Sequence, residues 1–357
     1  MAWTNSCRAP AARAKARRPA PLRRQSLYSF GVVRILLTHS PDALAQYYGE
    51  RALAGLRALG EVKLHHGSAP LEGEALIEAA GDCGLIVSYR QSPGPAAVFE
   101  RLPKLAALLR CAVDIRNIDV AAASKAGVLV TQASAGFVPA VSELVVGFLV
   151  DLSRGVSRAA AEYHAGHVPQ ARTGHELRAS TLGIIGYGAI GRELARVAKA
   201  LGMRVLVNDP YLKGIEQTSL DELLAQSDYV VPLAVATPET ENLMNDAAFA
   251  QMKPGAFFIN VSRGNLVDEA ALARALDSGR IAGCALDVGR APDQMPTPAL
   301  AARREVIATP HTAGLTLAAI EHQSLETVAQ AAQIVQGRAP KGAVNAEHWK
   351  RKELLQT

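Results

Sequence analysis

The strongest constraint on the fold is a glycine-rich stretch that joins a short apolar run to an amphipathic one. The apolar run Leu182–Ile185 has the composition of a buried strand, and Gly186, Gly188 and Gly191 follow it in the spacing G-x-G-x-x-G. A helical pattern and a second apolar run come next, and the latter ends at Asp209, about twenty residues further on. A strand, a glycine loop, a helix and a second strand with a terminal acid are typical of a dinucleotide-binding unit.

Each part of this stretch meets a different demand of nucleotide binding. The first glycine permits a tight turn, the second lets the backbone approach a pyrophosphate, and the third lets the helix pack on the strand. The helix N-terminus supplies free N–H groups and a positive dipole for the phosphates. The terminal carboxylate would bind the adenosine ribose and repel the extra phosphate of NADP, so NAD(H) is the predicted cofactor. Its predicted contacts here are Gly186, Tyr187, Gly188, Ala189, Ile190, Gly191 and Asp209.

Length and charge bound the class of protein. The chain has 357 residues, enough for two domains, and 49% of them are hydrophobic, as in a globular protein. Residues 1–30 hold seven Lys and Arg and no acid; without them the formal net charge of +5 becomes −2. A slightly acidic body argues against nucleic-acid binding. We expect residues 1–30 to be a disordered basic leader, with an organelle transit peptide or a basic tail for an acidic surface as alternatives.

Cysteine usage and hydropathy exclude further classes. The four cysteines are scattered and form no C-x-x-C, so neither a metal site nor a disulfide framework is predicted. This usage suits a reduced compartment, and we expect a cytoplasmic protein. The apolar run Val141–Val150 is too short for a membrane span and carries Glu143, so no membrane partner is expected.

Beyond the leader, strand-like runs alternate with helical patterns, which predicts parallel sheets covered by helices on both faces. Residues 43–59 are predicted to form one helix, residues 138–152 a buried packing or subunit-contact helix, and residues 155–178 a partly looped segment. Because ligands bind at the carboxyl ends of such strands, Tyr89 and Arg90 are candidate substrate residues.

Two polar residues follow buried strands in the nucleotide-binding half. Arg263 comes after the run AFFINVS, and His311 comes after VIATP. An arginine at such a strand end can bind a substrate carboxylate with its forked guanidinium and polarise a neighbouring carbonyl. A histidine there can exchange the proton that accompanies hydride transfer. Either residue alone has an ordinary structural explanation, but the pair downstream of a dinucleotide site favours dehydrogenase chemistry.

Seven stretches carry the pattern of one family. They are NIDVAAASKAGVLVT (117–131), GIIGYGAIGRELA (183–195), DPY (209–211), TPETENL (237–243), MKPGAFFINVSRGNLVDEAAL (252–272), IAGCALDV (281–288) and TPHTAG (309–314). With them, residues 31–345 resemble the D-isomer-specific 2-hydroxyacid dehydrogenases. The resemblance implies an α/β fold of two doubly wound parallel-sheet domains, in which a Rossmann-type NAD domain is inserted in a flavodoxin-like substrate domain. The implied boundaries are 31–131 and 315–345 for the substrate domain, 132–314 for the NAD-binding domain, and 346–357 for a C-terminal tail.

The same resemblance implies roles for individual residues. Arg263 would bind the substrate's carboxylate and carbonyl, and His311 would be the acid/base. Backbone N–H groups around Val113 and Asp114 would help to hold the substrate carboxylate. Members of the family are usually dimers that pack through the NAD domain. The implied contacts with the nicotinamide half of the cofactor are Thr237, Ser262, Arg263, Asp287, His311 and Gly314.

Three positions depart from the family pattern. The Glu that usually pairs with the histidine aligns with Pro292, which leaves Asp293 as the best substitute and Gln294 as the next. A Val-Gly pair that is usual near the substrate is Val113-Asp114 in this chain. The acid would repel a substrate carboxylate, or it would recruit a cationic or hydroxylated substrate. Leu233 replaces a histidine that is common after Asp228.

The sequence therefore predicts an NAD-dependent oxidoreductase that interconverts a small D-2-hydroxy acid and its 2-oxo acid. In it, Arg263 binds the acid, His311 moves the proton and Asp293 poises the histidine. The alternative is a non-catalytic NAD(H) sensor or interaction protein on the same fold, because nucleotide binding alone does not prove turnover. The expected partners are the small acid and a second copy of the chain.

Overall fold

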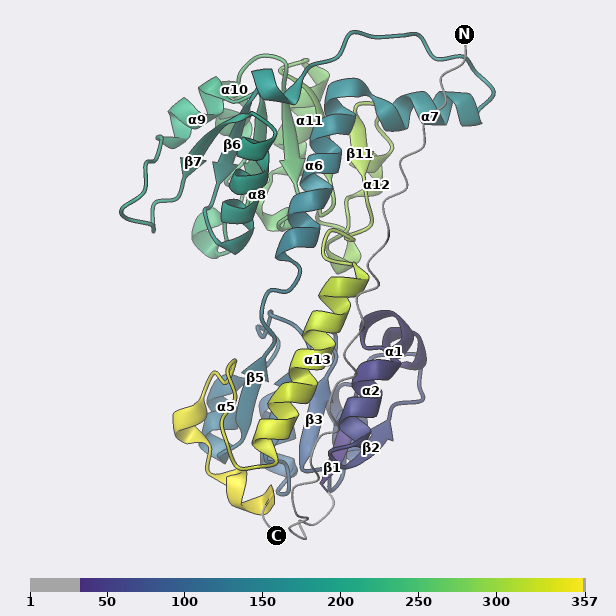
Figure 1. Ribbon diagram of the computed structural model, residues 1–357, viewed down its shortest axis with the longest axis vertical. Helices are drawn as coiled ribbons and strands as arrows, with labels where there is room; N and C mark the ends of the chain where they lie inside the picture. The colour runs from purple at the N-terminus through teal and green to yellow at the C-terminus, as the bar shows by residue number, and fades with distance from the viewer. Residues whose placement is uncertain (1–32, 356–357) are drawn as a thin grey trace, which may run out of the picture.

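The computed structural model describes residues 33–355 and consists of two lobes, each built around one parallel β-sheet (Figure 1). The predicted leader, residues 1–30, lies outside the described residues. Within the described part of the chain, no helix combines the length and apolar character needed to span a bilayer. The α/β class and the parallel sheets predicted from the sequence are confirmed.

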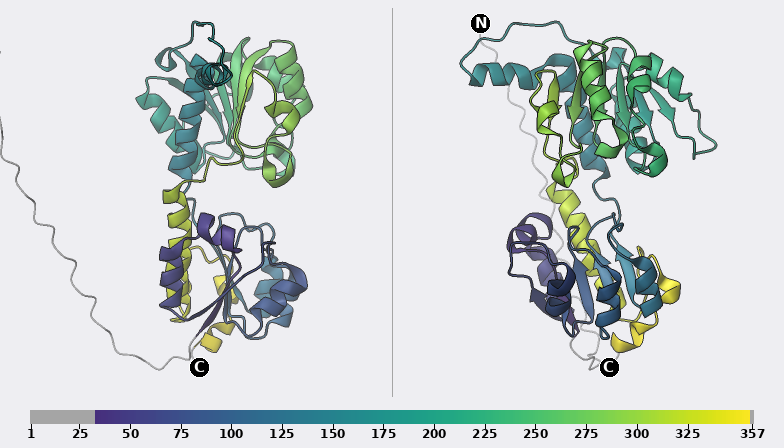
Figure 2. Two further views of the ribbon diagram at one scale, coloured as in Figure 1. Left: turned by 90° about the vertical axis from the view of Figure 1, so that its right-hand side faces the viewer. Right: turned by 180° about the vertical axis from the view of Figure 1, so that it is seen from behind.

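The first lobe holds a five-stranded sheet in the order β2-β1-β3-β4-β5, the order of flavodoxin-like folds. Its strands are buried on both faces because alternate side chains enter two different cores. Ile35 and Leu37 of β1 face α2 and α13, whereas Leu36 faces the layer formed by α3, α4 and α5. Figure 2 shows helices on both sides of this sheet. The elements of this lobe are β1 (Arg34–Leu37), α1 (Pro41–Tyr47), α2 (Glu50–Arg57), β2 (Glu61–Leu64), α3 (Gly73–Ala80), β3 (Leu85–Ser88), α4 (Ala96–Arg101), β4 (Ala107–Arg110), α5 (Val120–Ala126), β5 (Leu129–Gln132) and α13 (Leu317–Ile334).

The second lobe holds a six-stranded sheet in the order β11-β10-β9-β8-β6-β7. The strand order reverses between β6 and β8, so the loops after these two strands open a crevice for a ligand. One face is covered by α6 and α8, and the other by α9, α10 and α11. The elements are α6 (Val138–Arg154), α7 (Val156–His164), β6 (Thr181–Ile185), α8 (Ala189–Ala200), β7 (Arg204–Asn208), α9 (Leu220–Gln226), β8 (Tyr229–Pro232), α10 (Asp246–Gln251), β9 (Ala256–Asn260), α11 (Glu269–Asp277), β10 (Ile281–Leu286), α12 (Pro298–Ala301) and β11 (Val306–Ala308).

The chain passes between the lobes through residues 133–137 and again through residues 309–316 (Figure 1). The second passage returns the chain to the first lobe, where α13 packs against α2 and β4. Ser134 in the first passage donates hydrogen bonds from its N–H and its hydroxyl to the Glu326 carboxylate, at 2.7 and 2.8 Å. The first passage is therefore tied to the helix that the second one reaches.

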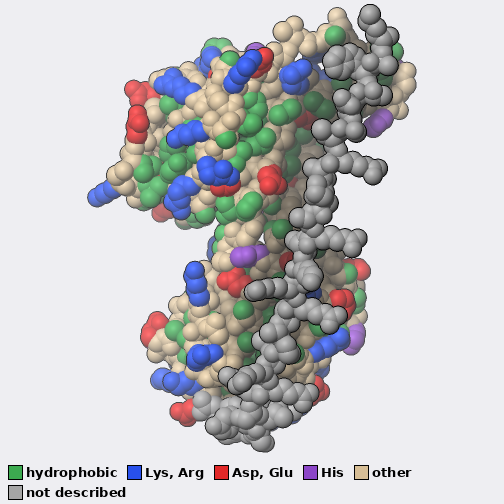
Figure 3. Space-filling model, in the orientation of Figure 1, with side chains coloured by type: hydrophobic (Ala, Val, Ile, Leu, Met, Phe, Trp, Pro, Cys, Tyr) green, Lys and Arg blue, Asp and Glu red, His purple; other side chains and the backbone are tan. Residues whose placement is uncertain are grey.

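One helical segment differs from the sequence-based expectation, and the partly looped character predicted for residues 155–178 is confirmed. The single helix predicted over 43–59 is two helices, because Gly49 interrupts it with a φ of +83° before α2 begins. The segment 155–178 contains α7, none of whose residues is buried, and Figure 1 shows this helix extending away from the sheet. On the face seen in Figure 3, Lys and Arg side chains are interspersed with Asp and Glu on both lobes, so this face presents no large surface of one charge.

Candidate active site

The glycine loop after β6 has two glycines that the fold requires and one that leaves space. Gly186 has a φ of +98°, and a Cβ there would lie 2.6 Å from the Ala234 nitrogen. A Cβ on Gly191 would lie 2.4 Å from the Gly186 carbonyl oxygen, so only glycine lets α8 pack this closely. A Cβ on Gly188, the residue that precedes α8, would meet nothing within 4 Å. The loop and the start of α8 therefore frame an open space in which backbone N–H groups can approach a phosphate.

Asp209 lies at the end of β7 beside this loop. Its Oδ2 accepts a hydrogen bond from the Tyr187 N–H at 2.8 Å, and its Oδ1 accepts one from the Tyr211 N–H at 3.1 Å. The carboxylate thus steadies the glycine loop and stands next to the space that Gly188 leaves open. This arrangement of donors, space and acid fits the adenosine and pyrophosphate of a dinucleotide.

Asp287, after β10, is fully buried and fixes the loop that carries His311. Its Oδ1 accepts hydrogen bonds from the Thr309 hydroxyl at 2.6 Å and the Thr312 N–H at 2.8 Å, and its Oδ2 accepts one from the Ala313 N–H at 2.9 Å. Its carbonyl oxygen accepts a bond from the His311 N–H at 2.9 Å. The observed partners of the Asp287 carboxylate therefore all belong to this loop, while its contact with a nicotinamide stays a prediction.

His311 is held by Asp293, though not by the atom that the sequence suggests. The carbonyl oxygen of Asp293 lies 2.7 Å from His311 Nδ1, whereas the Asp293 carboxylate pairs with Arg90 of the first lobe at 2.9 Å. The physical reason is the turn Pro292–Gln294, in which Asp293 and Gln294 adopt φ values of +55° and +60° and present a carbonyl to the imidazole. Because a carbonyl only accepts, Nδ1 carries the proton in this contact and Nε2 is the nitrogen left for chemistry.

Arg263 follows β9 and faces the loops of the other lobe. Its Nη1 donates to the Ser262 carbonyl at 2.8 Å. Burial lowers the pKa of Arg263, the carboxylate of Asp114 acts against this, and the guanidinium groups of Arg116 and Arg90 lower it further. These neighbours come from the loops after β3 and β4, so the loops at the carboxyl ends of the two sheets come together where the lobes meet, and we call this region the cleft.

The Asp114 side chain is occupied by an ion pair. Both of its carboxylate oxygens accept from Arg116, with contacts of 3.0, 3.0 and 2.6 Å. These hydrogen bonds hold the pKa of Asp114 at about 2, well below its usual value. The neighbouring Val113 is half-buried in the same loop. The carboxylate is therefore ionised and paired, which removes the attraction for a cationic substrate that the sequence left open.

Arg110, at the end of β4, is an organising residue that the sequence analysis missed. It is fully buried, and its guanidinium donates to the Ser88 hydroxyl and the Ser92 carbonyl at 3.0 Å each and to the Asp114 carbonyl at 3.2 Å, besides the Tyr89 carbonyl and the Asn117 side chain. Burial lowers its pKa to about 10. It ties the loops after β3 and β4 together. The available signal was a charged residue at the end of the apolar strand ALLR, which is the pattern that singled out Arg263.

The remaining predicted residues lie at different depths around the cleft. Tyr89 is buried, and its ring packs 4.9 Å from that of His39. Ser262 donates from its hydroxyl to the Ala234 carbonyl at 3.2 Å, beside the glycine loop. Thr237 begins the short turn after β8, with its N–H bonded to Thr240. Gly314 packs on Phe137, and a Cβ added to Gly314 would lie 3.3 Å from the Phe137 Cβ.

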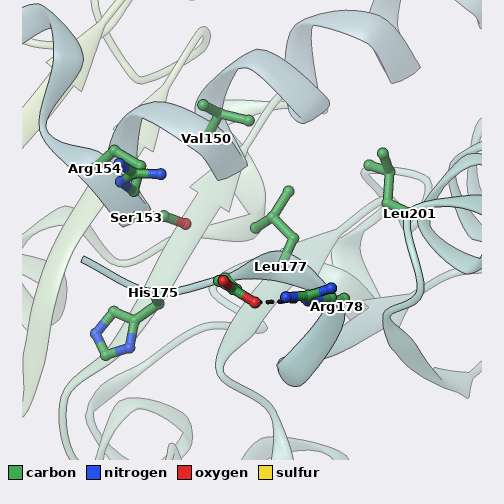
Figure 4. A pocket seen from close by; sticks show the side chains of 8 residues that line it. Val150, Ser153, Arg154, His175, Leu177, Arg178 and Leu201 are labelled. Carbon is green, nitrogen blue, oxygen red and sulfur yellow. Dashed lines mark hydrogen bonds and ion pairs between the residues drawn. The ribbon is translucent and has the colours of Figure 1, made fainter.

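A surface hollow on α6 lies elsewhere. It is lined by Val150, Ser153, Arg154, His175, Glu176, Leu177, Arg178 and Leu201, with Glu176 paired to Arg178 (Figure 4). None of the predicted site residues lines it, so we assign the chemistry to the cleft between the sheets. Within residues 33–355, no group of three or more His, Cys, Asp or Glu side chains is arranged to hold a metal ion.

Comparison with known proteins gives the family. Residues 146–313 match the model of the D-isomer-specific 2-hydroxyacid dehydrogenase NAD-binding domain. The chain is 37% identical over 287 residues to D-3-phosphoglycerate dehydrogenase of Haemophilus influenzae, covering 78% of this chain and 70% of the relative. The chain belongs to the D-isomer-specific 2-hydroxyacid dehydrogenase family. NAD is accordingly its cofactor, and the second lobe contains the family's NAD-binding domain.

Further similarities agree with this family. Glyoxylate reductase of Korarchaeum cryptofilum is 32% identical, with 84% of this chain and 93% of that protein covered. The solved structure of D-2-hydroxyisocaproate dehydrogenase superposes with a TM-score of 0.78 at 25% identity, covering 88% of this chain and all of the other. The chain spans about half the length of the mammalian D-3-phosphoglycerate dehydrogenases that it matches, 53% for that of Rattus norvegicus. Because these relatives are oxidoreductases by name, a non-catalytic sensor is not favoured.

Proposed function

We propose that the protein interconverts a small D-2-hydroxy acid and the corresponding 2-oxo acid, with NAD(H) as the redox partner. The observation that carries this is the meeting of Arg263 and the His311 loop with the Arg90 and Asp114 loops of the other lobe. One cleft thus combines a forked cation and a proton carrier, which are the two groups that the reaction requires of the protein.

Arg263 would bind the substrate carboxylate and polarise the C2 carbonyl with its guanidinium. His311 would donate a proton from Nε2 to the carbonyl oxygen in reduction and take it back from the hydroxyl in oxidation, while its Nδ1 proton stays on the Asp293 carbonyl. When bound, the nicotinamide supplies or accepts the hydride at C2. The backbone N–H groups near Val113 and Asp114 would hold the far side of the carboxylate.

The cofactor would lie along the ends of the second sheet. Its pyrophosphate would face Gly188 and the start of α8, and its adenosine ribose would face Asp209. Thr237, Ser262 and Gly314 would surround the nicotinamide ribose and ring. The open space at Gly188 and the acceptor at Asp209 support this placement.

The charges of the cleft favour a substrate with one negative charge. The Arg110 guanidinium is bonded to oxygens of its own lobe, and three further guanidinium groups gather there. Two of them are paired, Arg90 with Asp293 and Arg116 with Asp114. Among the described residues, Arg263 has no carboxylate within ion-pair distance, so it is the cation that we propose for the substrate carboxylate. A phosphorylated or dicarboxylic acid would bring a second anionic group that would have to compete with these ion pairs.

NADH consumption by the purified full chain tests this proposal. The panel would contain four monocarboxylates, namely glyoxylate, hydroxypyruvate, pyruvate and a branched 2-oxo acid. A phosphorylated 2-oxo acid and a 2-oxo dicarboxylate would be compared with them because both carry more negative charge. We expect turnover with at least one monocarboxylate, and a higher kcat/KM than for the phosphorylated acid or the dicarboxylate. Tight NADH binding without turnover of any acid would overturn the enzyme assignment in favour of a sensor.

We further propose a homodimer formed through the second lobe, in the cytoplasm. In the single chain α7 has no buried residue, and Val156, Tyr163 and Val168 are more than half exposed, at 55, 62 and 86%. Exposed apolar groups on a projecting arm are typical of a protein–protein contact. The boundaries 31–131 with 315–345, and 132–314, are kept as proposed domain limits. The separate tail predicted over 346–357 is not kept, because Trp349 and Leu355 are buried in the core of the first lobe.

A further inference from the structure

The cleft contains one chain of contacts that joins the two lobes to the acid/base histidine. Arg90, after β3 of the first lobe, donates to the Asp293 carboxylate of the second lobe at 2.9 Å. The carbonyl oxygen of the same Asp293 lies 2.7 Å from His311 Nδ1. We name these three residues, in that order, the cross-lobe link.

The second-lobe half of the cross-lobe link is a constrained turn. Asp293, Gln294 and His311 all adopt positive φ values, of +55°, +60° and +54°, which non-glycine residues rarely adopt. Such conformations persist only where the surroundings hold them, and they cluster at functional sites. Inside the turn, the Gln294 carbonyl accepts from the Gly289 N–H at 2.8 Å. Bonds of Met295 with Ala291 and Pro292 also hold the turn from inside, and the Arg90 ion pair with Asp293 holds it from the other lobe.

The first-lobe half of the cross-lobe link is held by contacts within its own lobe. The Arg90 guanidinium lies 5.6 Å from the centroid of the Tyr47 ring. The Arg90 carbonyl accepts from the Asn117 side chain at 3.3 Å, and Asn117 is in turn held by the buried Arg110. An arginine that lies against a tyrosine ring, and whose own carbonyl is held in this way, keeps its direction, so the ion pair with Asp293 transmits position as well as charge.

From these contacts we propose that Arg90 is a positioning residue that orients His311 through Asp293. Contact between the lobes then sets the direction of the histidine that moves the proton. The carbonyl of Asp293 does what a paired Glu does in relatives, and the Asp293 side chain serves to anchor that carbonyl across the cleft. The proposal rests on the acid/base role of His311 given under Proposed function.

The stability of the fold is not the expected role of this link. The side chains of Arg90 and Asp293 are 35 and 45% exposed, and ion pairs this exposed contribute little to stability. Misplacement of a catalytic group by about 1 Å, in contrast, can cost about a hundredfold in rate. Loss of the link should therefore lower kcat while leaving the unfolding midpoint unchanged.

The test compares Arg90→Gln, Asp293→Asn and the double variant with the wild type, on the acid that the wild type reduces best. We expect each single variant to lower kcat by about ten- to a hundredfold with KM within about twofold, because Arg263 still binds the carboxylate. The double variant should be no slower than the slower single variant, because both substitutions break the same connection. Arg101→Gln removes a matched, bidentate arginine–carboxylate pair with Glu74 far from the cleft and should leave kcat unchanged.

Three results would overturn the inference. A raised KM with unchanged kcat in Arg90→Gln alone would make Arg90 a substrate-binding residue. If the double variant shows the full sum of the two single effects on log kcat, the Asp293 carboxylate acts on His311 directly and not through Arg90. Wild-type kinetics in both single variants would show that the link does not position His311. A wild type without turnover would instead contradict the proposed function, and unchanged midpoints of thermal unfolding separate all these results from misfolding.

Discussion

His39, at the end of β1, is a buried histidine without a hydrogen-bond partner for either ring nitrogen within the described part of the chain. Its ring lies between those of Tyr48 and Tyr89, with centroids 4.9 Å from each. Burial, together with the smaller effect of the Arg110 charge, lowers the pKa of His39 to about 3. The folded protein therefore holds this side chain neutral.

This side chain gives the fold a pH dependence of defined sign. In the unfolded chain His39 has its ordinary pKa of 6.5. Below that pH the unfolded state binds a proton at His39, whereas the folded state does not. Stability is complete above pH 6.5 and falls progressively as the pH drops toward 3. At pH 5 the loss should be about 2 kcal/mol. Urea unfolding at pH 7 and pH 5 measures it.

His39→Phe is the matched variant, because a phenyl ring can occupy the space between the two tyrosines. Between pH 7 and pH 5, the free energy of unfolding of this variant should fall less than that of the wild type, by the about 2 kcal/mol attributed to His39. Equal losses in the two proteins would contradict a neutral, desolvated His39.

Some residues of the site could be predicted from the sequence, and others could not. Arg263 and His311 stand out because each follows an apolar strand, and the structure brings both to the cleft. Asp293 was predicted as a partner of His311, and it is one, but sequence patterns describe side chains and the contact is made by a carbonyl. Arg110 also follows apolar residues, at the end of β4, but it was passed over because an isolated arginine is usually solvated.

At the scale of elements, the glycine loop and α8 offer a matched pair of substitutions. Gly191→Ala would force a Cβ to within 2.4 Å of the Gly186 carbonyl oxygen, so it should destabilise the second lobe. Gly188→Ala meets no atom within 4 Å and should leave the unfolding midpoint unchanged, but its methyl group would occupy the space proposed for the pyrophosphate. NADH titration followed by fluorescence should show at least a tenfold weaker Kd for Gly188→Ala. Unchanged NADH affinity there would contradict the proposed placement.

Elements with strong periodic patterns were predicted well, and those fixed by context were not. The helix after the glycine loop and the strand β9 lie where the sequence puts them, because each has an apolar pattern bounded by turn residues. The interruption at Gly49 was missed, since a lone glycine in a helical pattern is often tolerated. The helix α7 was missed because it buries no apolar side chain against its own lobe, and so carries little of the usual signal.

At the scale of the whole molecule, the proposed dimer is tested by mass. We expect the full chain to have the mass of a dimer in solution, and Tyr163→Glu, which places a charge on the exposed face of α7, to shift it toward the monomer. Tyr211→Glu is the control, because Tyr211 is 82% exposed but lies in the loop after β7. Light scattering coupled to size-exclusion chromatography measures the mass of the wild type and of both variants. A monomeric wild type would contradict the assembly.

The two-lobed plan was the most predictable level, since the alternation of strands and helices fixes a doubly wound sheet almost by itself. How the lobes meet was not predictable, because Arg90 and Asp293 are 203 residues apart and nothing local couples them. The cleft is therefore a property of the assembled molecule.

The measurement that tests the central claim most directly is NADH oxidation by His311→Gln beside the wild type, with the best monocarboxylate of the panel at saturation. Glutamine cannot exchange a proton as an acid/base, so kcat should fall about a hundred- to ten-thousandfold while NADH affinity stays within about twofold. That result would place His311 at the proton transfer. A variant that reduces the acid as fast as the wild type would contradict the account.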